Sequence, residues 1–139
     1  MDYEGSCHCG AIGFTYSTEM RPNRWSVRAC QCSFCRAHDA LSTSDPDGSL
    51  AFTTSSPEML QRYRFGLGTA DFLLCRNCGI YIGAAIESDN GCFGIINTHA
   101  LKSAPGDVAM AVPITYDNEN TEGRISRRGV RWTPTEALP

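Results

Sequence analysis

Cysteine spacing is the feature that most constrains this chain of 139 residues. Seven of the eight cysteines fall into three short clusters, which are Cys7 with Cys9, Cys30 with Cys32 and Cys35, and Cys75 with Cys78. Two thiolates that share one zinc ion must lie about 3.5–4 Å apart, because each lies about 2.3 Å from the metal. Cysteines separated by one or two residues in a tight turn meet that requirement. The three clusters therefore predict metal binding.

Glycine residues follow two of the clusters. Gly10 comes directly after Cys9, and Gly79 comes directly after Cys78. Glycine adopts a positive φ without steric cost, so the turn can aim backbone N–H groups at the sulfur atoms. This pattern is typical of a zinc knuckle. The middle cluster has Ser33 after its second cysteine and is expected to form a different kind of loop.

The seven clustered thiols divide most simply into four plus three. The two pairs followed by glycine would close one tetrahedral site, and the triplet would hold a second metal ion with one position open. Closed four-ligand sites are structural, whereas three protein ligands with an open position are typical of catalytic zinc. Two alternatives stay open at this point. One is a single four-cysteine zinc with surplus buried cysteines, and the other is iron in the four-cysteine site.

The first residues of the chain and its net charge predict the compartment in which the protein works and the kind of partner that it binds. The first residues are Met-Asp-Tyr-Glu-Gly-Ser, which contain two acids and lack the apolar segment of a signal peptide. No apolar run approaches the length of about 18 residues that a spanning helix needs. We therefore expect a cytoplasmic protein with reduced thiols and no membrane contact. The formal charge of −3 disfavours nucleic acid as a partner.

Three strings of residues carry a resemblance to a known family. They are Gly5-Ser6-Cys7-His8-Cys9-Gly10, Cys30-Gln31-Cys32-Ser33-Phe34-Cys35-Arg36 and Cys75-Arg76-Asn77-Cys78-Gly79. In this order they resemble the glutathione-dependent formaldehyde-activating enzyme family, which also includes centromere protein V. The resemblance runs from about residue 5 to about residue 103. One departure is Ala40, which stands where a glycine is common shortly after the third cysteine of the middle motif.

The resemblance implies a fold, ligand sets and an activity. The implied fold is a β-tent of curled antiparallel sheets. The implied structural zinc ligands are Cys7, Cys9, Cys75 and Cys78, and the implied catalytic zinc ligands are Cys30, Cys32 and Cys35. The implied activity is the condensation of glutathione with formaldehyde to S-hydroxymethylglutathione, which is classed as carbon–sulfur lyase chemistry. The implied ligand sets agree with the division of the thiols into four plus three.

The remaining sequence pattern predicts an all-β domain that spans residues 1–139, with zinc knuckles and a short C-terminal helix. Strands are expected at Ala11–Ser17, Trp25–Ala29, Ser49–Thr53, Met59–Phe65, Ala70–Leu74, Ile80–Ile86 and Cys92–Asn97. Asn90-Gly91 predicts a hairpin turn. A single helical turn is expected at His99–Ser103 and a loop at Ala104–Asn118.

A stripe of arginines marks the predicted C-terminal helix, Thr121–Arg131. Its members are Arg124, Arg127, Arg128 and Arg131, which share one face at helical spacing. Ile125 and Trp132 fall on another face and are expected to pack on the sheet. We favour a solvated basic face for the stripe. The alternatives are a binding site for a substrate's carboxylates and a patch that binds nucleic acid.

The chemistry of a three-thiolate zinc site favours a particular reaction class. Three thiolates make the metal a poor Lewis acid for water, whereas a soft thiol is a good fourth ligand. Binding would lower the pKa of that thiol and hold a thiolate ready to attack an aldehyde carbonyl. His38 follows Cys35 by three residues and is a candidate base or proton shuttle. Arg36 is a candidate partner for an anionic thiol.

Three function classes stay open on the sequence alone. The first is a zinc-dependent carbon–sulfur lyase that acts on a small thiol, such as glutathione, and an aldehyde. The second is a non-catalytic, zinc-stabilised module that binds nucleic acid or protein. The third is a sulfoxide reductase, since methionine-R-sulfoxide reductases also use the β-tent fold and Cys92 is the one unassigned thiol. Otherwise Cys92 is expected to be a small buried residue of a strand.

Overall fold

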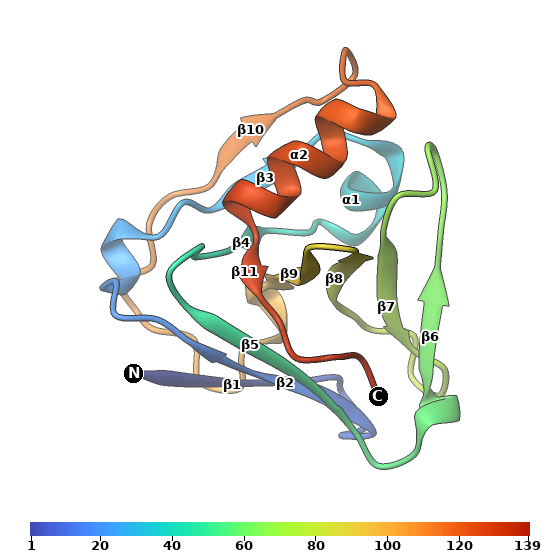
Figure 1. Cartoon of the computed structure of the whole chain (residues 1–139). Helices are drawn as coiled ribbons and strands as arrows, with labels where there is room; N and C mark the ends of the chain where they lie inside the picture. Colours follow the sequence, from blue (N-terminus) through green and yellow to red (C-terminus); the bar gives the residue numbers. More distant parts are fainter.

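The computed structural model describes residues 1–139, and most of its regular structure is β-strand (Figure 1). The smaller of two sheets contains three antiparallel strands in the order β1-β2-β5. Their bounds are β1 Asp2–Ser6, β2 Ile12–Ser17 and β5 Ser49–Thr54. The strands predicted at the last two positions are confirmed, whereas β1 has no counterpart among the predictions.

The larger sheet contains eight strands. Seven of them follow the order β10-β3-β4-β9-β8-β7-β6, and β11 pairs with β9 beside this path. The bounds are β3 Arg28–Cys30, β4 Ser42–Thr43, β6 Leu60–Tyr63, β7 Asp71–Cys75, β8 Tyr81–Ser88, β9 Gly91–Asn97, β10 Val112–Ile114 and β11 Thr133–Pro134. All neighbours are antiparallel except β3 and β10, which are parallel. The predicted all-β fold of antiparallel sheets is thus confirmed, with this one parallel pair added.

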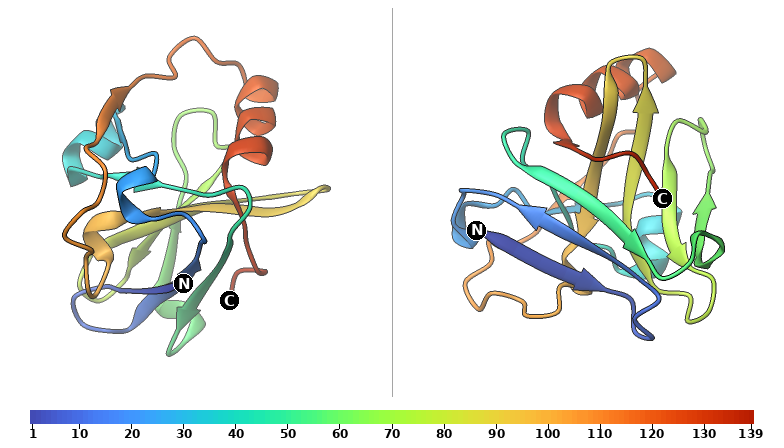
Figure 2. Two further views of the ribbon diagram at one scale, coloured as in Figure 1. Left: turned by 90° about the vertical axis from the view of Figure 1, so that its left-hand side faces the viewer. Right: turned by 60° about the horizontal axis from the view of Figure 1, so that its bottom comes forward.

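The hydrophobic core lies between the two sheets. Phe14 of β2, Leu73 of β7 and Ile82 of β8 are at most 1% exposed and belong to one cluster of 16 buried residues. Figure 2 shows β1, β2 and β5 as a separate layer that crosses β8 and β9. The opposite face of β8 is buried too, because Tyr81 and Ala84 belong to a second cluster of nine residues. Residues Tyr81 to Ile86 are therefore buried without interruption, and the first predicted residue of this strand, Ile80, is exposed.

Two α-helices and three short 3-10 helices complete the fold. Their bounds are α1 Ser33–His38, α2 Thr121–Arg131, η1 Pro22–Arg24, η2 Pro57–Met59 and η3 Thr98–Ala100. The C-terminal helix is confirmed at its predicted bounds. It begins after Asn120, whose side-chain oxygen accepts a hydrogen bond of 2.7 Å from the Gly123 N–H and so caps the first turn. Neither α-helix is long and apolar enough to cross a membrane.

The segment after α2 fixes this helix to the larger sheet. Trp132 is 4% exposed, and the next residue begins β11. The Thr133 hydroxyl accepts a hydrogen bond of 2.8 Å from the Asp45 N–H. Beyond β11 the chain runs beside β5 (Figure 1), where the Glu136 N–H donates to the Leu50 carbonyl at 2.9 Å. The prediction that Trp132 packs on the sheet is confirmed, whereas Ile125 is 38% exposed and does not.

Four other predictions need correction. The strand predicted at Trp25–Ala29 is β3, which begins only at Arg28. Trp25 follows η1 and packs in the core cluster instead of forming part of the strand. The helical turn expected from His99 is η3, and its cap is the side chain of Asn97, which accepts from the His99 N–H. The expected loop at Ala104–Asn118 contains β10. The loop expected after the second cysteine of the triplet contains α1.

Candidate metal sites and the arginine-lined cavity

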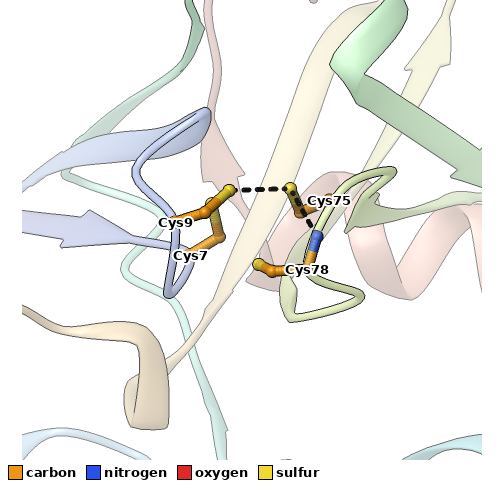
Figure 3. A group of neighbouring side chains, drawn as sticks. All are labelled: Cys7, Cys9, Cys75 and Cys78. Carbon is orange, nitrogen blue, oxygen red and sulfur yellow. Dashed lines mark hydrogen bonds between the residues drawn. The ribbon is translucent and has the colours of Figure 1, made fainter.

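Two turns from different sheets bring four cysteines together (Figure 3). Cys7 and Cys9 lie in the turn between β1 and β2, and Cys75 and Cys78 lie at the turn between β7 and β8. Their four sulfur atoms all lie within 4.8 Å of one another. The Cys9 Sγ is 3.7 Å from the Cys7 Sγ and 3.6 Å from the Cys75 Sγ. The group is a compact four-sulfur donor set that joins the two sheets.

The predicted knuckle geometry is present in both turns. Gly10 has φ +85° and Gly79 has φ +81°, a conformation that L-residues with a side chain rarely adopt. In the first turn the Ile12 N–H donates to the Cys7 Sγ at 3.4 Å. In the second turn the Cys78 N–H donates to the Cys75 Sγ at the same distance. These N–H groups offset negative charge on sulfur, which suits thiolate ligands.

Hydrogen bonds and burial act differently on the thiols of this site. A hydrogen bond from the Asn77 side chain and another from the Ala11 backbone lower the pKa of Cys9 to about 6. Burial raises the pKa of Cys75 to about 11. Cys9 is exposed and Cys75 is 1% exposed, so solvent reaches one ligand and not the other. Closing such a site requires the loss of protons, and metal affinity falls in acid as a consequence.

The other three clustered cysteines form the second donor set. Cys30 ends β3, Cys32 caps α1, and Cys35 lies in the first turn of that helix. Their sulfur atoms also lie within 4.8 Å of one another. The Cys32 Sγ accepts a hydrogen bond of 3.4 Å from the Cys35 N–H, as a serine hydroxyl would at a helix N-cap. The helix start therefore holds two of the three ligands in a fixed relation.

The thiols of the triplet share their protons unevenly. A hydrogen bond from the Cys35 thiol lowers the pKa of Cys30 to about 5. The same hydrogen bond, together with burial, raises the pKa of Cys35. The cluster thus holds negative charge at neutral pH even before all of its protons are lost. Both donor sets consist only of sulfur, which fits a soft or borderline metal such as zinc.

The triplet opens into a cavity of about 90 Å³. The cavity walls come from distant parts of the chain and include the three cysteines, apolar side chains and four arginines. The apolar members are Phe65, Ala70, Phe72, Ile95 and Trp132, and the arginines are Arg28, Arg124, Arg127 and Arg128. The four-cysteine group has no residue in this wall. The triplet is therefore the donor set that a small molecule in the cavity can reach.

The arginine stripe of α2 faces this cavity, so the preferred prediction of a solvated face is wrong for three of its four members. Arg128 is 7% exposed, and the side chains of Arg124 and Arg127 are 20% and 17% exposed. Only Arg131 is exposed in the way a solvated face requires. The apolar residues of the helix, Ile125 and Val130, are exposed instead.

The remaining predicted site residues lie outside the cavity wall. The ring of His38 packs on Phe34 with 4.5 Å between ring centroids and lies 5.7 Å from that of Tyr81. Arg36 is exposed. Neither lines the cavity, and a catalytic role for either residue stays a prediction. Burial raises the pKa of Cys92 to about 11, and this residue also lies outside the cavity wall, so it lacks the properties of a reactive thiolate.

Most residues of the cavity wall were not predicted as site residues, and three of them show why. Arg28 lies on β3 two residues before the first cysteine of the triplet, Thr69 precedes β7, and Trp132 follows α2. Only Arg28 had a usable signal, because a basic residue close to a cysteine cluster can balance its charge. The other two reach the cavity through contacts between segments that are far apart in the sequence.

Fold and donor sets together define a class of protein. The chain is a mostly antiparallel β protein with two all-sulfur donor sets that could each hold a metal ion, of which one links the two sheets and the other opens into a cavity. The family model described as glutathione-dependent formaldehyde-activating enzyme matches residues 2–112, and the chain belongs to that family. The resemblance drawn from the three cysteine motifs is thereby confirmed.

The comparison with solved structures gives a consistent result. The chain is similar to a Rhodobacter sphaeroides protein of known crystal structure, with 30% sequence identity and a TM-score of 0.56. The match covers 78% of this chain and 99% of that chain. No curated protein matches this chain. The helix α2 lies beyond the residues that the family model covers.

Metal content is the first expected result. We expect about two zinc ions per chain, one of which a chelator removes much faster, because a three-ligand site with an open position exchanges faster than a closed site. Mass spectrometry of the native protein, before and after brief chelation, measures both quantities. A single ion that resists chelation would contradict the two-site interpretation.

Proposed function

We propose that this protein is a zinc-dependent enzyme of the carbon–sulfur lyase type. Its reaction joins a small thiol, such as glutathione, to an aldehyde, such as formaldehyde, and yields an S-hydroxymethyl adduct. The observation that carries the proposal is the three-cysteine donor set at the wall of a cavity that also bears arginines. The family assignment supports the same substrate classes.

The proposed reaction has a simple balance. The thiol sulfur forms a bond to the carbonyl carbon, the C=O double bond becomes a C–O single bond, and the thiol proton ends on that oxygen. Zinc held by Cys30, Cys32 and Cys35 would supply a soft Lewis acid that lowers the pKa of a thiol ligand. No oxidant or reductant is needed. Because the thiolate and the aldehyde are both reactive, positioning of the two reactants is a large part of the catalytic task.

The residues of the chain contribute binding and the exclusion of water. Phe65, Phe72 and Trp132 contribute an apolar surface to the cavity wall, which limits the number of water molecules beside the reacting sulfur. The guanidinium groups of the same wall suit the carboxylates of a thiol such as glutathione. A cavity of about 90 Å³ admits the thiol end of such a molecule, and the rest would extend through the open mouth.

Exchange spectroscopy tests the proposal directly. Formaldehyde labelled with ¹³C reacts with glutathione to an equilibrium mixture, and magnetisation transfer measures the rate of interconversion. The zinc-loaded protein should raise this rate at catalytic concentrations, and Cys32→Ser should abolish the increase because it removes one ligand of the triplet. Cys92→Ser is the matched control and should retain the full rate. An unchanged rate with the zinc-loaded protein would overturn the proposal and favour the non-catalytic binding module.

The proposal extends to location and partners. A cytoplasmic protein would meet glutathione at high concentration with its thiols reduced. Three of the four arginines of α2 line the cavity, and a basic stripe that faces inward offers little to the backbone of a nucleic acid. Small molecules are therefore the partners that we propose.

A further inference from the structure

Arg128 is a buried cation with an unfilled hydrogen-bonding position. Its side chain lines the cavity and is 7% exposed. One terminal nitrogen, Nη1, donates to the Thr69 hydroxyl at 2.6 Å, and the guanidinium carbon lies 4.7 Å from the centroid of the Trp132 ring. The Nε atom is buried and has no hydrogen-bond partner. A buried donor without a partner is costly, and a ligand group that reached this edge of the guanidinium would remove that cost.

Arg28 lies in the same cavity wall and also lacks a carboxylate partner. Its two terminal nitrogens donate to the Ser44 hydroxyl at 2.8 Å and to the Ser26 carbonyl at 3.4 Å, both of which are neutral acceptors. Burial lowers the pKa of both guanidinium groups, to about 10 in the case of Arg128. Each still carries its charge at neutral pH. The cavity wall thus contains two cations that the protein itself does not pair with a carboxylate.

The other two cavity arginines are different. Glu119 accepts from Arg127 at 2.7 Å and from Arg124 at 3.4 Å, so one carboxylate is shared between them. Arg127 also lies over the ring of Tyr116, with 3.6 Å between the guanidinium carbon and the ring centroid. Asp117 lines the cavity mouth but is exposed and forms no ion pair. Arg124 and Arg127 therefore already have an acidic partner within the protein and are not free to bind an anionic ligand in the same way.

The net charge beside the cavity favours an anionic ligand. Three thiolates with one Zn²⁺ carry a net charge of −1, and two unpaired guanidinium groups carry +2, which leaves +1 before a ligand enters. A sulfur that binds as thiolate neutralises this net charge, so a carboxylate on the same ligand would be held by the unpaired guanidinium groups themselves. A planar carboxylate also matches the fork of donors that a guanidinium group presents, including the free Nε of Arg128.

We propose that Arg128 and Arg28 form a carboxylate-binding site that selects thiols bearing a carboxylate for the three-cysteine centre. The inference rests on the proposed function, since it concerns the substrate of that same cavity. Arg128 lies in α2, beyond residues 2–112 that the family model matches. The proposed site thus combines Arg28, which lies within the matched region, with Arg128, which lies outside it.

Two thiols of similar size test this selectivity. 3-Mercaptopropionate carries a carboxylate, and 2-mercaptoethanol carries a hydroxyl in its place. Calorimetric titration of the zinc-loaded protein should give an affinity at least about 10-fold higher for the carboxylate-bearing thiol, because hydrogen bonds between charged groups are the strong ones. Arg128→Gln should abolish most of this preference while the affinity for 2-mercaptoethanol changes by less than about twofold.

Control variants separate charge recognition from a structural role. Arg131→Gln removes an exposed arginine of the same helix and should leave both affinities unchanged. Arg28→Gln should reduce the preference as Arg128→Gln does, and it serves as the second variant if Arg128→Gln lowers the melting temperature. Equal affinity for the two thiols in the native protein would overturn the inference. Equal loss of both affinities in a folded Arg128→Gln protein would also overturn it.

A thiol-blocked ligand separates this inference from the proposed function. S-methylglutathione keeps its carboxylates and cannot form a thiolate. If the carboxylate site exists, Arg128→Gln weakens S-methylglutathione binding, whether or not thiols bind the metal. If Cys32→Ser leaves the affinity for 3-mercaptopropionate unchanged, the proposed function fails while the carboxylate site still stands. If Arg128→Gln has no effect on S-methylglutathione, the carboxylate site fails while the proposed function still stands.

Discussion

Replacing Cys78 by serine should lower the melting temperature by about 10 °C or more, because the four-cysteine site links the two sheets. Its ligands are far apart in the sequence, since Cys9 and Cys75 are separated by 66 positions. A metal ion that joins such distant residues removes much of the conformational entropy of the unfolded chain. The free energy of zinc binding also stabilises the folded state directly, because the unfolded chain has no preformed site. Thermal unfolding followed by circular dichroism measures the change.

Replacing Cys32 by serine should have a much smaller effect on stability. The three ligands of this site lie within residues 30–35, so the metal cross-links little of the chain. A serine hydroxyl can also take over the role of the Cys32 Sγ, which caps α1 by accepting from the Cys35 N–H. We expect a loss of less than about 4 °C, which corresponds to about 1 kcal/mol for a domain of this size. Equal losses in the two variants would contradict the division into a structural and a catalytic site.

The two groups of cysteines were predictable because their determinants are local. A cysteine pair in a tight turn places two sulfur atoms close together in any fold, and the glycine after it permits the positive φ found at Gly10 and Gly79. The division into four plus three ligands followed from the same local signals. The exposed turn at Asn90-Gly91 and the bounds of α2 were likewise predictable, because turn residues and the Asn120 cap act over a few positions.

The cavity was not predictable because its walls meet only through long-range contacts. Helical spacing placed Arg124, Arg127 and Arg128 on one face, yet the spacing is the same whether that face meets solvent or a cavity. The direction is set by β11, whose pairing with β9 fixes the end of α2. The helix has few apolar residues, and its arginine face turns toward the cavity while Ile125 is exposed. The sequence of the helix alone does not determine this orientation.

Two short elements were missed for related reasons. The helix α1 begins at a cysteine cap, which is not one of the residue types that signal a helix start. The strand β10 has three residues, Val112–Ile114, one of which is proline. It exists only because β3 offers a parallel partner. Both elements adjoin the triplet, so the local sequence predicted its ligands but not the elements that hold them.

Cobalt in the three-cysteine site should show directly whether the sulfur of the thiol substrate binds the metal. Sulfur ligation of cobalt gives a strong charge-transfer band, and we expect this band to grow when glutathione supplies a fourth sulfur to Cys30, Cys32 and Cys35. S-methylglutathione should cause little change in the band, since its sulfur cannot become a thiolate. Absorption titration of the cobalt-substituted protein compares the two ligands under identical conditions.

The pH dependence of this titration gives an independent check. A thiol that binds as thiolate must lose its proton, so the affinity should rise with pH and level off near the pKa of the free thiol, which is about 8.5. At a fixed, near-saturating glutathione concentration, the midpoint should therefore lie below that value, because the metal competes with the proton. The guanidinium groups of the cavity keep their charge over this range, and carboxylate recognition stays constant while the sulfur titrates. If S-methylglutathione binds as tightly as glutathione at every pH, the sulfur is not a ligand. Recognition would then rest on the arginines alone, and the proposed reaction at the three-cysteine centre would have no basis.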